Sequence, residues 1–187
     1  MRVFVALEIP DEVRRAIAGL IGRLQKTCRG ARWVRPESIH VTLKFIGETP
    51  PEQVERIREL LTGVQSPAAV EINFRGTGFF PNANRPRVFW AGIEASPNLA
   101  DLAAEIEGRL EKLGIARESR EFKPHLTLAR FNSPVGLSGL LAAVTTEGAV
   151  EFGRGSWREF HLYQSQLKPG GAVYTKLASF EFVKAAL

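Results

Sequence analysis

The sequence predicts an α+β fold made of two similar lobes, each a mostly antiparallel sheet with flanking helices, around a central cleft. Two strand-like segments, Ile39–Phe45 and Pro124–Arg130, read almost the same at a sequence offset of 85. Both contain His-x-Thr. Strands and helices alternate without the steady βαβ rhythm of a doubly wound sheet. We therefore expect residues 1–187 to form one domain built from two duplicated lobes.

The predicted elements follow the same order in each half, judged by the spacing of apolar residues and by turn residues. The first half is predicted to contain a strand, a helix, the first His-x-Thr strand, a second helix, a strand and a loop: Arg2–Ile9, Asp11–Lys26, Ile39–Phe45, Pro51–Gly63, Val70–Phe74 and Gly76–Pro81. The second half is predicted to contain a strand, a helix, the second His-x-Thr strand, a short helix and a hairpin of two strands: Arg87–Glu94, Leu99–Leu113, Pro124–Arg130, Leu137–Val144, Glu159–Leu167 and Val173–Phe182.

Further identities support the duplication. Arg2-Val3-Phe4 recurs at the same offset as Arg87-Val88-Phe89, and Arg32 and Arg35 fall on Arg117 and Arg120. Several identities at one offset are more simply explained by a repeated unit than by chance.

Composition narrows the class of protein. Hydrophobic residues make up 44% of the chain and charged residues 24%, as in ordinary globular domains. The net charge of +5 is compatible with an anionic partner such as RNA. The single cysteine, Cys28, excludes an intrachain disulfide. We expect a cytoplasmic monomer without a signal peptide, membrane segment, cofactor or protein partner.

The two His-x-Thr pairs indicate acid–base chemistry. Side chains alternate along a strand, so His40 and Thr42 should share one face and Val41, Leu43 and Phe45 the other. Near neutral pH a neutral imidazole can accept a proton from water while an imidazolium donates one to a leaving oxygen. If a phosphorus atom lies between the two imidazoles, the hydroxyls of Thr42 and Thr127 would bind its non-bridging oxygens. The repeat makes the histidines equivalent, so this reasoning leaves open which of them is the acid.

Metal binding is the competing use of histidine. A zinc site needs three or four ligands. Neither His-x-Thr segment contains Asp, Glu or Cys beside its histidine, and His161 would have to supply a third ligand. His161 has no threonine two positions on, and we interpret it as structural. The sequence therefore predicts catalysis by His40 and His125 without a metal.

Four residues are candidates for substrate contact. Lys44 continues the predicted His40 face, and Arg130 follows the second pair, although alternation alone would start Arg130 on the core side. Phe79 and Phe80 lie in a predicted loop and could stack on a base. Other basic residues flank the motifs and could line a positive cleft for a nucleic-acid backbone: Arg32, Arg35, Arg120 and Lys123.

These motifs resemble those of the two-histidine phosphoesterases, specifically the RNA 2′,3′-cyclic phosphodiesterase (2′-5′ RNA ligase) family. The resemblance extends over the whole chain and rests on five segments: Arg2–Ile9, His40–Glu48, Pro86–Trp90, Pro124–Arg130 and Gly170–Tyr174. It implies a bilobal fold and hydrolysis of RNA 2′,3′-cyclic phosphate to a 2′-phosphomonoester. It also implies that His40 is the proton donor and His125 the proton acceptor, and that the reaction can run in reverse as 2′-5′ ligation.

Two alternatives remain open at this stage. The same chemistry could act on a small cyclic nucleotide or on a 2′-5′-linked oligonucleotide. The protein could also be a non-catalytic RNA-binding module, in which case replacing His40 and His125 would leave RNA affinity intact.

Overall fold

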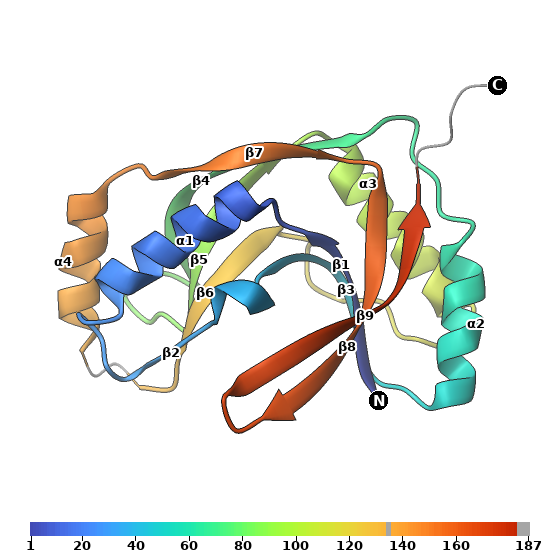
Figure 1. Ribbon diagram of the computed structural model, residues 1–187, viewed down its shortest axis with the longest axis horizontal. Helices are drawn as coiled ribbons and strands as arrows, with labels where there is room; N and C mark the ends of the chain where they lie inside the picture. Colours follow the sequence, from blue (N-terminus) through green and yellow to red (C-terminus); the bar gives the residue numbers. More distant parts are fainter. Residues whose placement is uncertain (134–135, 183–187) are drawn as a thin grey trace.

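The computed structural model describes residues 1–133 and 136–182, so the last five residues of the predicted domain lie outside the described part. It is an α+β structure with two antiparallel sheets, which confirms the predicted fold class (Figure 1). The helices are α1 (Asp11–Leu24), α2 (Pro51–Leu61), α3 (Asn98–Glu111) and α4 (Leu137–Glu147), with a 3₁₀ turn at Pro36–Ser38. The strands are β1 (Arg2–Glu8), β2 (Ala31–Trp33), β3 (His40–Glu48), β4 (Val70–Phe80), β5 (Val88–Ala95), β6 (His125–Phe131), β7 (Glu151–Trp157), β8 (Glu159–Lys168) and β9 (Gly171–Glu181).

The two sheets do not coincide with the two halves of the sequence. The four-stranded sheet has the order β3-β1-β8-β9, and the five-stranded sheet has the order β2-β6-β5-β4-β7. The second half of the chain thus supplies β8 and β9 to the sheet that contains the first His-x-Thr strand. The first half supplies β2 and β4 to the other sheet. Each sheet is therefore built from both halves of the sequence.

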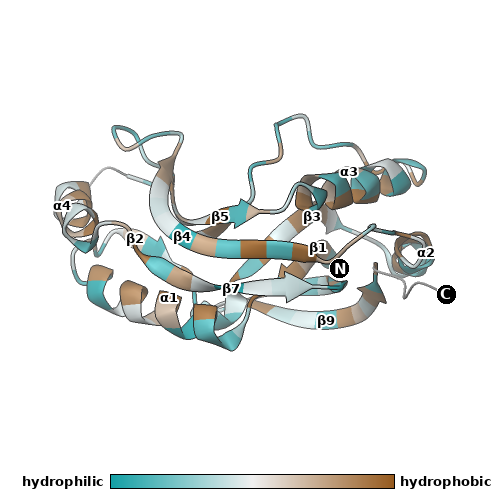
Figure 2. Ribbon diagram, turned by 90° about the horizontal axis from the view of Figure 1, so that it is seen from above, coloured by the Kyte–Doolittle hydropathy of each residue, from teal (hydrophilic) through white to brown (hydrophobic). Residues whose placement is uncertain are grey.

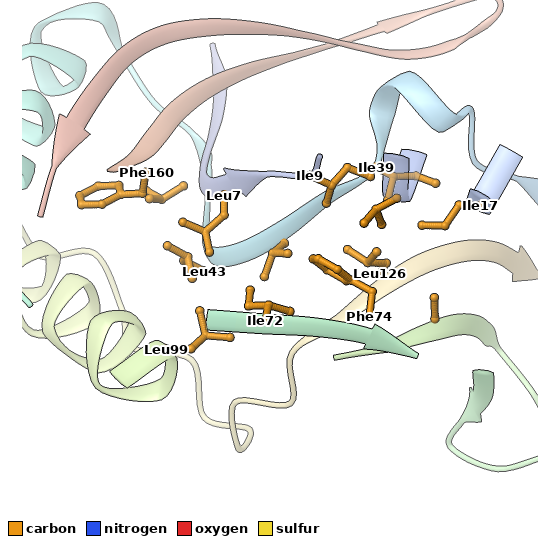
Figure 3. Close-up of a cluster of buried hydrophobic side chains, with 14 of the residues drawn as sticks. Leu7, Ile9, Ile17, Ile39, Leu43, Ile72, Phe74, Leu99, Leu126 and Phe160 are labelled. Atoms are coloured by element: carbon orange, nitrogen blue, oxygen red, sulfur yellow. The ribbon is translucent and has the colours of Figure 1, made fainter. Parts of the chain in front are cut away.

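One hydrophobic core lies between the sheets (Figure 3). Leu7, Leu43 and Phe160 reach it from the four-stranded sheet, and Phe74 and Leu126 reach it from the five-stranded sheet. All five are at most 4% exposed. The core fixes which face of each sheet remains available for a site, because the opposite face points away from it.

The helices cover the ends of this arrangement. In Figure 1, α1 and α4 lie at one end of the molecule and α2 and α3 at the other. Figure 2 shows apolar and polar residues interspersed along α1, whose apolar residues recur at helical spacing and are buried: Val13, Ile17, Leu20, Ile21 and Leu24. Burial of this stripe stabilises the helix far more than its intrinsic propensity does. No helix in the described part of the chain has the length and apolar character needed to cross a membrane.

One predicted element is wrong, and two strands of the structure were not predicted. The predicted Gly76–Pro81 loop is mostly strand, since β4 continues to Phe80. Gly78 is required there because the indole of Trp90 lies against its Cα, where any Cβ would collide with the ring. Strands β2 and β7 were not predicted; β7 contains two glycines and pairs with β4 in an antiparallel register.

Candidate active site

Both His-x-Thr pairs lie at the start of a strand and point away from the core. In β3, Val41 and Leu43 are buried in the core while Thr42 is exposed. In β6, Leu126 and Leu128 are buried while His125 and Thr127 are partly exposed. Alternation therefore places each histidine and its threonine on the outer face of a sheet, as predicted.

A β-bulge follows each pair. In β3, Val5 pairs with Lys44 and Ala6 pairs with Thr42, so Leu43 is the extra residue. In β6, Phe89 pairs with Ala129 and Trp90 with Thr127, so Leu128 is the extra residue. The two extra leucines are separated by the same sequence offset as the two histidines. A bulge places the side chains that directly follow it on the face opposite to the one that uninterrupted alternation predicts.

The first bulge corrects the prediction for Lys44. Lys44 lies on the core side, is 5% exposed, and binds the carboxylate of Glu107 at 2.6 Å and the carbonyl oxygen of Ala116 at 2.7 Å. It is a buried structural ion pair and does not share the face of His40. Phe45 takes the place predicted for Lys44 and is 52% exposed, although alternation had placed it in the core.

The second bulge has the opposite consequence for Arg130. Uninterrupted alternation would turn it toward the core, but the extra residue Leu128 returns it to the face of His125 and Thr127, where it is exposed. Burial lowers the pKa of the His125 imidazole, and the charge of Arg130 lowers it further. Arg130 is therefore at the site, for a reason that the sequence pattern did not reveal.

The two candidate aromatic residues separate. Phe80 lies on the outer side, where its ring meets that of His125 edge-on at a centroid distance of 4.9 Å. Phe79 points the other way and packs against Phe89 and Phe131 at the core, with centroid distances of 5.0 and 6.4 Å. The prediction that Phe79 contacts substrate is wrong, because the predicted loop is a strand and its side chains alternate.

We call the outer face of each sheet that carries a His-x-Thr pair its histidine face. In the four-stranded sheet the histidine face consists of His40, Thr42, Phe45, Phe4, Tyr163 and Tyr174. In the five-stranded sheet it consists of His125, Thr127, Arg130, Trp90 and Phe80. Tyr163 and Tyr174 could not be assigned to this face from the sequence, because their positions depend on the pairing of β8 with β1 and β9.

His40 sits among aromatic rings. The centroid of its imidazole lies 4.6 Å from that of Tyr163, 5.5 Å from Tyr174 and 6.1 Å from Phe4. This burial disfavours the imidazolium and lowers the pKa of His40 from 6.5 to about 4, against a raising effect from the backbone of Ser38. The carboxylate of Glu8, its cross-strand neighbour, also raises the pKa, and the charges of Arg14 and His161 lower it.

The backbone two residues before each histidine acts on its imidazole. Nδ1 of His125 lies 2.7 Å from the carbonyl oxygen of Lys123, two residues before it. The backbone of Ser38, two residues before His40, is close enough to act on that imidazole but outside hydrogen-bond geometry, and Nδ1 of His40 is buried without a partner in the described residues. With Nδ1 of His125 held by the backbone of its own strand, that ring keeps Nε2 for chemistry. Burial also lowers the pKa of His125.

Unpartnered polar atoms gather at the histidine faces. Within the described residues, three buried side-chain polar atoms have no hydrogen-bond partner: Nδ1 of His40, Nε1 of Trp90 and the hydroxyl oxygen of Tyr163. Trp90 is the cross-strand partner of Thr127, and Tyr163 touches His40. Buried polar atoms are normally satisfied, so exceptions concentrated in one place mark a functional site.

Two observations connect the two histidine faces. Strands β3 and β6 contact each other although they belong to different sheets. Tyr174 touches His40, and the charge of Arg130 lowers the pKa of the Tyr174 hydroxyl against the raising effect of burial. Arg130 thus acts on a ring of each sheet. The β9 end of the β8–β9 hairpin is held in place because Arg35 and Ser38 donate hydrogen bonds of 3.0 Å to the carbonyl of Ala172.

The remaining histidine is structural, as predicted. His161 is 2% exposed, and its Nδ1 lies 2.9 Å from the hydroxyl oxygen of Ser179. Among the described residues, no group of three or more His, Cys, Asp or Glu side chains is arranged to hold a metal ion.

The fold and these paired motifs define a phosphoesterase of the two-histidine class. The family model for LigT like Phosphoesterase matches residues 7–90 and 93–174, and the chain belongs to that family. This confirms the family resemblance predicted from the sequence.

Relatives and solved structures agree with the assignment. The chain is similar to the RNA 2′,3′-cyclic phosphodiesterase of Archaeoglobus fulgidus, with 36% identity covering 97% of this chain and 100% of the relative. It is 37% identical to the RNA 2′,3′-cyclic phosphodiesterase of Thermus thermophilus, covering 96% of this chain and 89% of the relative. The crystal structure of TT0787 of Thermus thermophilus superimposes with a TM-score of 0.80 at 34% identity, covering 97% of this chain and 98% of the other.

Proposed function

We propose that this protein hydrolyses RNA 2′,3′-cyclic phosphate ends to 2′-phosphomonoesters by paired-histidine acid–base catalysis, without a metal ion. The observation that supports this most is the pair of His-Thr sets on the touching strands β3 and β6, each followed by a bulge at the equivalent position. Family membership and the activity for which the relatives are named support the substrate class.

In the proposed reaction, water attacks phosphorus from the side of His125. Nε2 of His125 takes the proton from that water as the new P–O bond forms. The bond from phosphorus to the ribose 3′ oxygen breaks, and His40 delivers its proton to that oxygen. The product is a 2′-phosphomonoester and a free 3′ hydroxyl. The roles of the two histidines follow the family resemblance.

The threonines and Arg130 complete the site. The hydroxyls of Thr42 and Thr127 donate hydrogen bonds to the two non-bridging oxygens, one from each sheet, where negative charge must be held during the displacement. Arg130 lies farther along the same histidine face, where its charge would attract the anionic substrate. Phe80 and Phe45 would limit the space on either side.

Substrate binding and protonation of His40 are coupled in this scheme. With a pKa of about 4, His40 is neutral in the unliganded protein near pH 7. A bound phosphate anion favours the imidazolium and raises that pKa. The acid is then present mainly in the complex, so protonation accompanies binding of the anionic substrate.

The same groups can run the reaction in reverse. If a 5′ hydroxyl of a second RNA takes the place of water, His125 removes its proton and a 2′-5′ phosphodiester forms. Hydrolysis dominates because water is abundant and a second RNA end is not. We expect the protein to act as a monomer in the cytoplasm.

The product distinguishes this proposal from its closest alternative. The protein is incubated with a nucleoside 2′,3′-cyclic phosphate, and the product is identified by comparison with authentic 2′- and 3′-phosphates. We expect the 2′-phosphate. A 3′-phosphate would mean that the 2′ oxygen leaves, which reverses the proposed regiochemistry. No turnover, together with unchanged RNA affinity in His40→Ala and His125→Ala, would indicate a binding module.

A further inference from the structure

Two arginines lie directly opposite each other beside the catalytic pair of the five-stranded sheet. Strands β2 and β6 are antiparallel, and Arg32 is the cross-strand partner of Arg130. Directly opposite residues of two antiparallel strands project to the same face. Trp33, the neighbour of Arg32, packs against the core, so Arg32 extends the histidine face that carries Thr127 and Arg130.

Neither arginine is neutralised. Within the described residues neither Arg32 nor Arg130 forms an ion pair, and both are exposed. Other basic residues that flank the motifs are engaged, since Arg120 pairs with Glu118 at 2.8 Å and Lys123 with Glu121 at 3.5 Å. Like charges directly opposite on a sheet are destabilising. A bound anion would therefore stabilise the pair.

The position of the pair suits a second phosphate of the same RNA. Arg130 lies three residues beyond Thr127, but the bulge at Leu128 takes up one of them, so the two are separated by two steps of the partner strand, roughly 7 Å at about 3.3 Å per residue. It is also close enough to His125 for its charge to lower the pKa of that imidazole. A phosphate held at Thr127 would thus leave the next phosphodiester of the backbone within reach of the two guanidinium groups, which suit phosphate geometry well.

The equivalent place in the four-stranded sheet has a different chemistry. There the residue after the bulge is Phe45, stacked on Phe4 at a centroid distance of 6.3 Å and an interplanar angle of 13°. The guanidinium of Arg2 lies 5.2 Å from the centre of the Phe45 ring. The pair of unneutralised guanidinium groups is therefore specific to the sheet that carries His125.

We propose that Arg32 and Arg130 bind the phosphodiester that precedes the cyclic phosphate in the substrate strand, so that the protein prefers oligonucleotide ends to mononucleotides. This inference rests on the proposed function. The competing explanation is that Arg32 only protects β2, which is an edge strand, from pairing with other chains. That role would not alter substrate preference.

The test compares two substrates, a nucleoside 2′,3′-cyclic phosphate and a dinucleotide with the same 2′,3′-cyclic end. We expect the wild-type kcat/KM to be about tenfold higher for the dinucleotide, and this ratio to fall to about one in Arg32→Gln, as for one lost charge-assisted contact. The slope of log kcat/KM against log salt should be steeper for the dinucleotide by about 0.7, for one additional phosphate. Arg32→Lys should retain the slope and part of the preference.

Arg15→Gln is the matched control. Arg15 is an exposed arginine of α1, a helix that contributes no residue to either histidine face, and its removal changes net charge equally. We expect it to leave the ratio unchanged. A wild-type ratio near one with equal salt slopes would overturn the inference while turnover of the mononucleotide still upheld the proposed function. A ratio that persists in Arg32→Gln would assign Arg32 to edge protection and also overturn it.

Two further experiments, one on product binding and one on ligation, test the phosphodiester site independently of hydrolysis. Binding of the 2′-phosphorylated dinucleotide and mononucleotide is measured by calorimetry, so the phosphodiester site is tested even if catalysis is absent. Equal affinities would refute it. In the other arm, a free dinucleoside monophosphate is added to the mononucleotide substrate. Arg32-dependent ligation without any dinucleotide preference would assign the arginines to the 5′-hydroxyl strand and contradict the inference.

Discussion

Acidification should destabilise the wild-type protein more than a His40→Gln variant. Burial lowers the pKa of His40 from 6.5 to about 4 in the folded protein. Between these values the unfolded chain binds a proton that the folded chain does not, so the free energy of unfolding falls as the pH falls. The stabilisation is fully present above pH 6.5 and is lost progressively toward pH 4.

The magnitude follows from the size of the shift. A change of one pKa unit corresponds to about 1.4 kcal/mol, so the full effect of His40 is about 3 kcal/mol. Between pH 7 and pH 4.5 about 2 kcal/mol of this should be lost. The pKa values of His125 and His161 are also lowered, but they contribute equally to both proteins and cancel in the comparison.

The assay is urea denaturation of both proteins at pH 7 and pH 4.5, with the loss of unfolding free energy compared between them. Only this difference is interpreted, because the substitution itself changes stability at pH 7. An NMR titration of the His40 ring gives the midpoint directly. Equal losses in the two proteins, together with a His40 midpoint at or above 6.5, would refute the reasoning that burial among Phe4, Tyr163 and Tyr174 controls this imidazole.

Three other outcomes are expected. Lys44→Met should lower the free energy of unfolding by about 3–5 kcal/mol, because it leaves the carboxylate of Glu107 buried without its cation. Urea denaturation should show that the double variant Lys44→Met/Glu107→Leu recovers most of this loss. Unchanged stability of the single variant would contradict the ion pair. His40→Ala and His125→Ala should each reduce kcat/KM by about 10² to 10⁴, and the double variant should lose much less than the product of the two; a loss below tenfold in either single variant would exclude that histidine as a proton carrier. The kcat/KM should stay within about twofold in EDTA, and abolition by EDTA with restoration by zinc would contradict the metal-free mechanism.

The features that could be predicted from the sequence depend on local pattern. The His-x-Thr segments are strands because Val41 and Leu43, and likewise Leu126 and Leu128, alternate with polar residues. The helices follow from apolar residues at helical spacing, as in α1. The outward direction of the four proposed catalytic residues needed no further information.

The errors have physical causes that local pattern does not carry. A bulge adds one residue to a strand, and nothing in the sequence before Lys44 or Arg130 announces it. It exchanged the predicted positions of Lys44 and Phe45 and brought Arg130 to the site. Gly78 was interpreted as a strand breaker, whereas its missing side chain makes room for Trp90 within a continuous strand.

The assignment of strands to sheets depends on long-range pairing, which the local pattern does not contain. The repeat offset predicted two lobes, and the structure has two sheets, but β2 and β4 of the first half join the five-stranded sheet. The pairing of Arg32 with Arg130 arises from that exchange. Ala6 is the cross-strand partner of Thr42, and Trp90 is the cross-strand partner of Thr127. Ala6 and Trp90 are one residue closer in sequence than the two threonines are, so the offset differs between strands. The recurrence of Arg2-Val3-Phe4 therefore does not mark structurally equivalent residues, and the duplication remains a prediction.

The most direct test is a crystal structure of the protein with a nucleoside vanadate, which mimics the five-coordinate phosphorus of an in-line displacement. We predict one vanadium centre with Nε2 of His125 and Nε2 of His40 within hydrogen-bond distance of its two opposite apical oxygens. The hydroxyls of Thr42 and Thr127 should contact its equatorial oxygens. A vanadate held by only one imidazole, or by neither, would contradict the central claim.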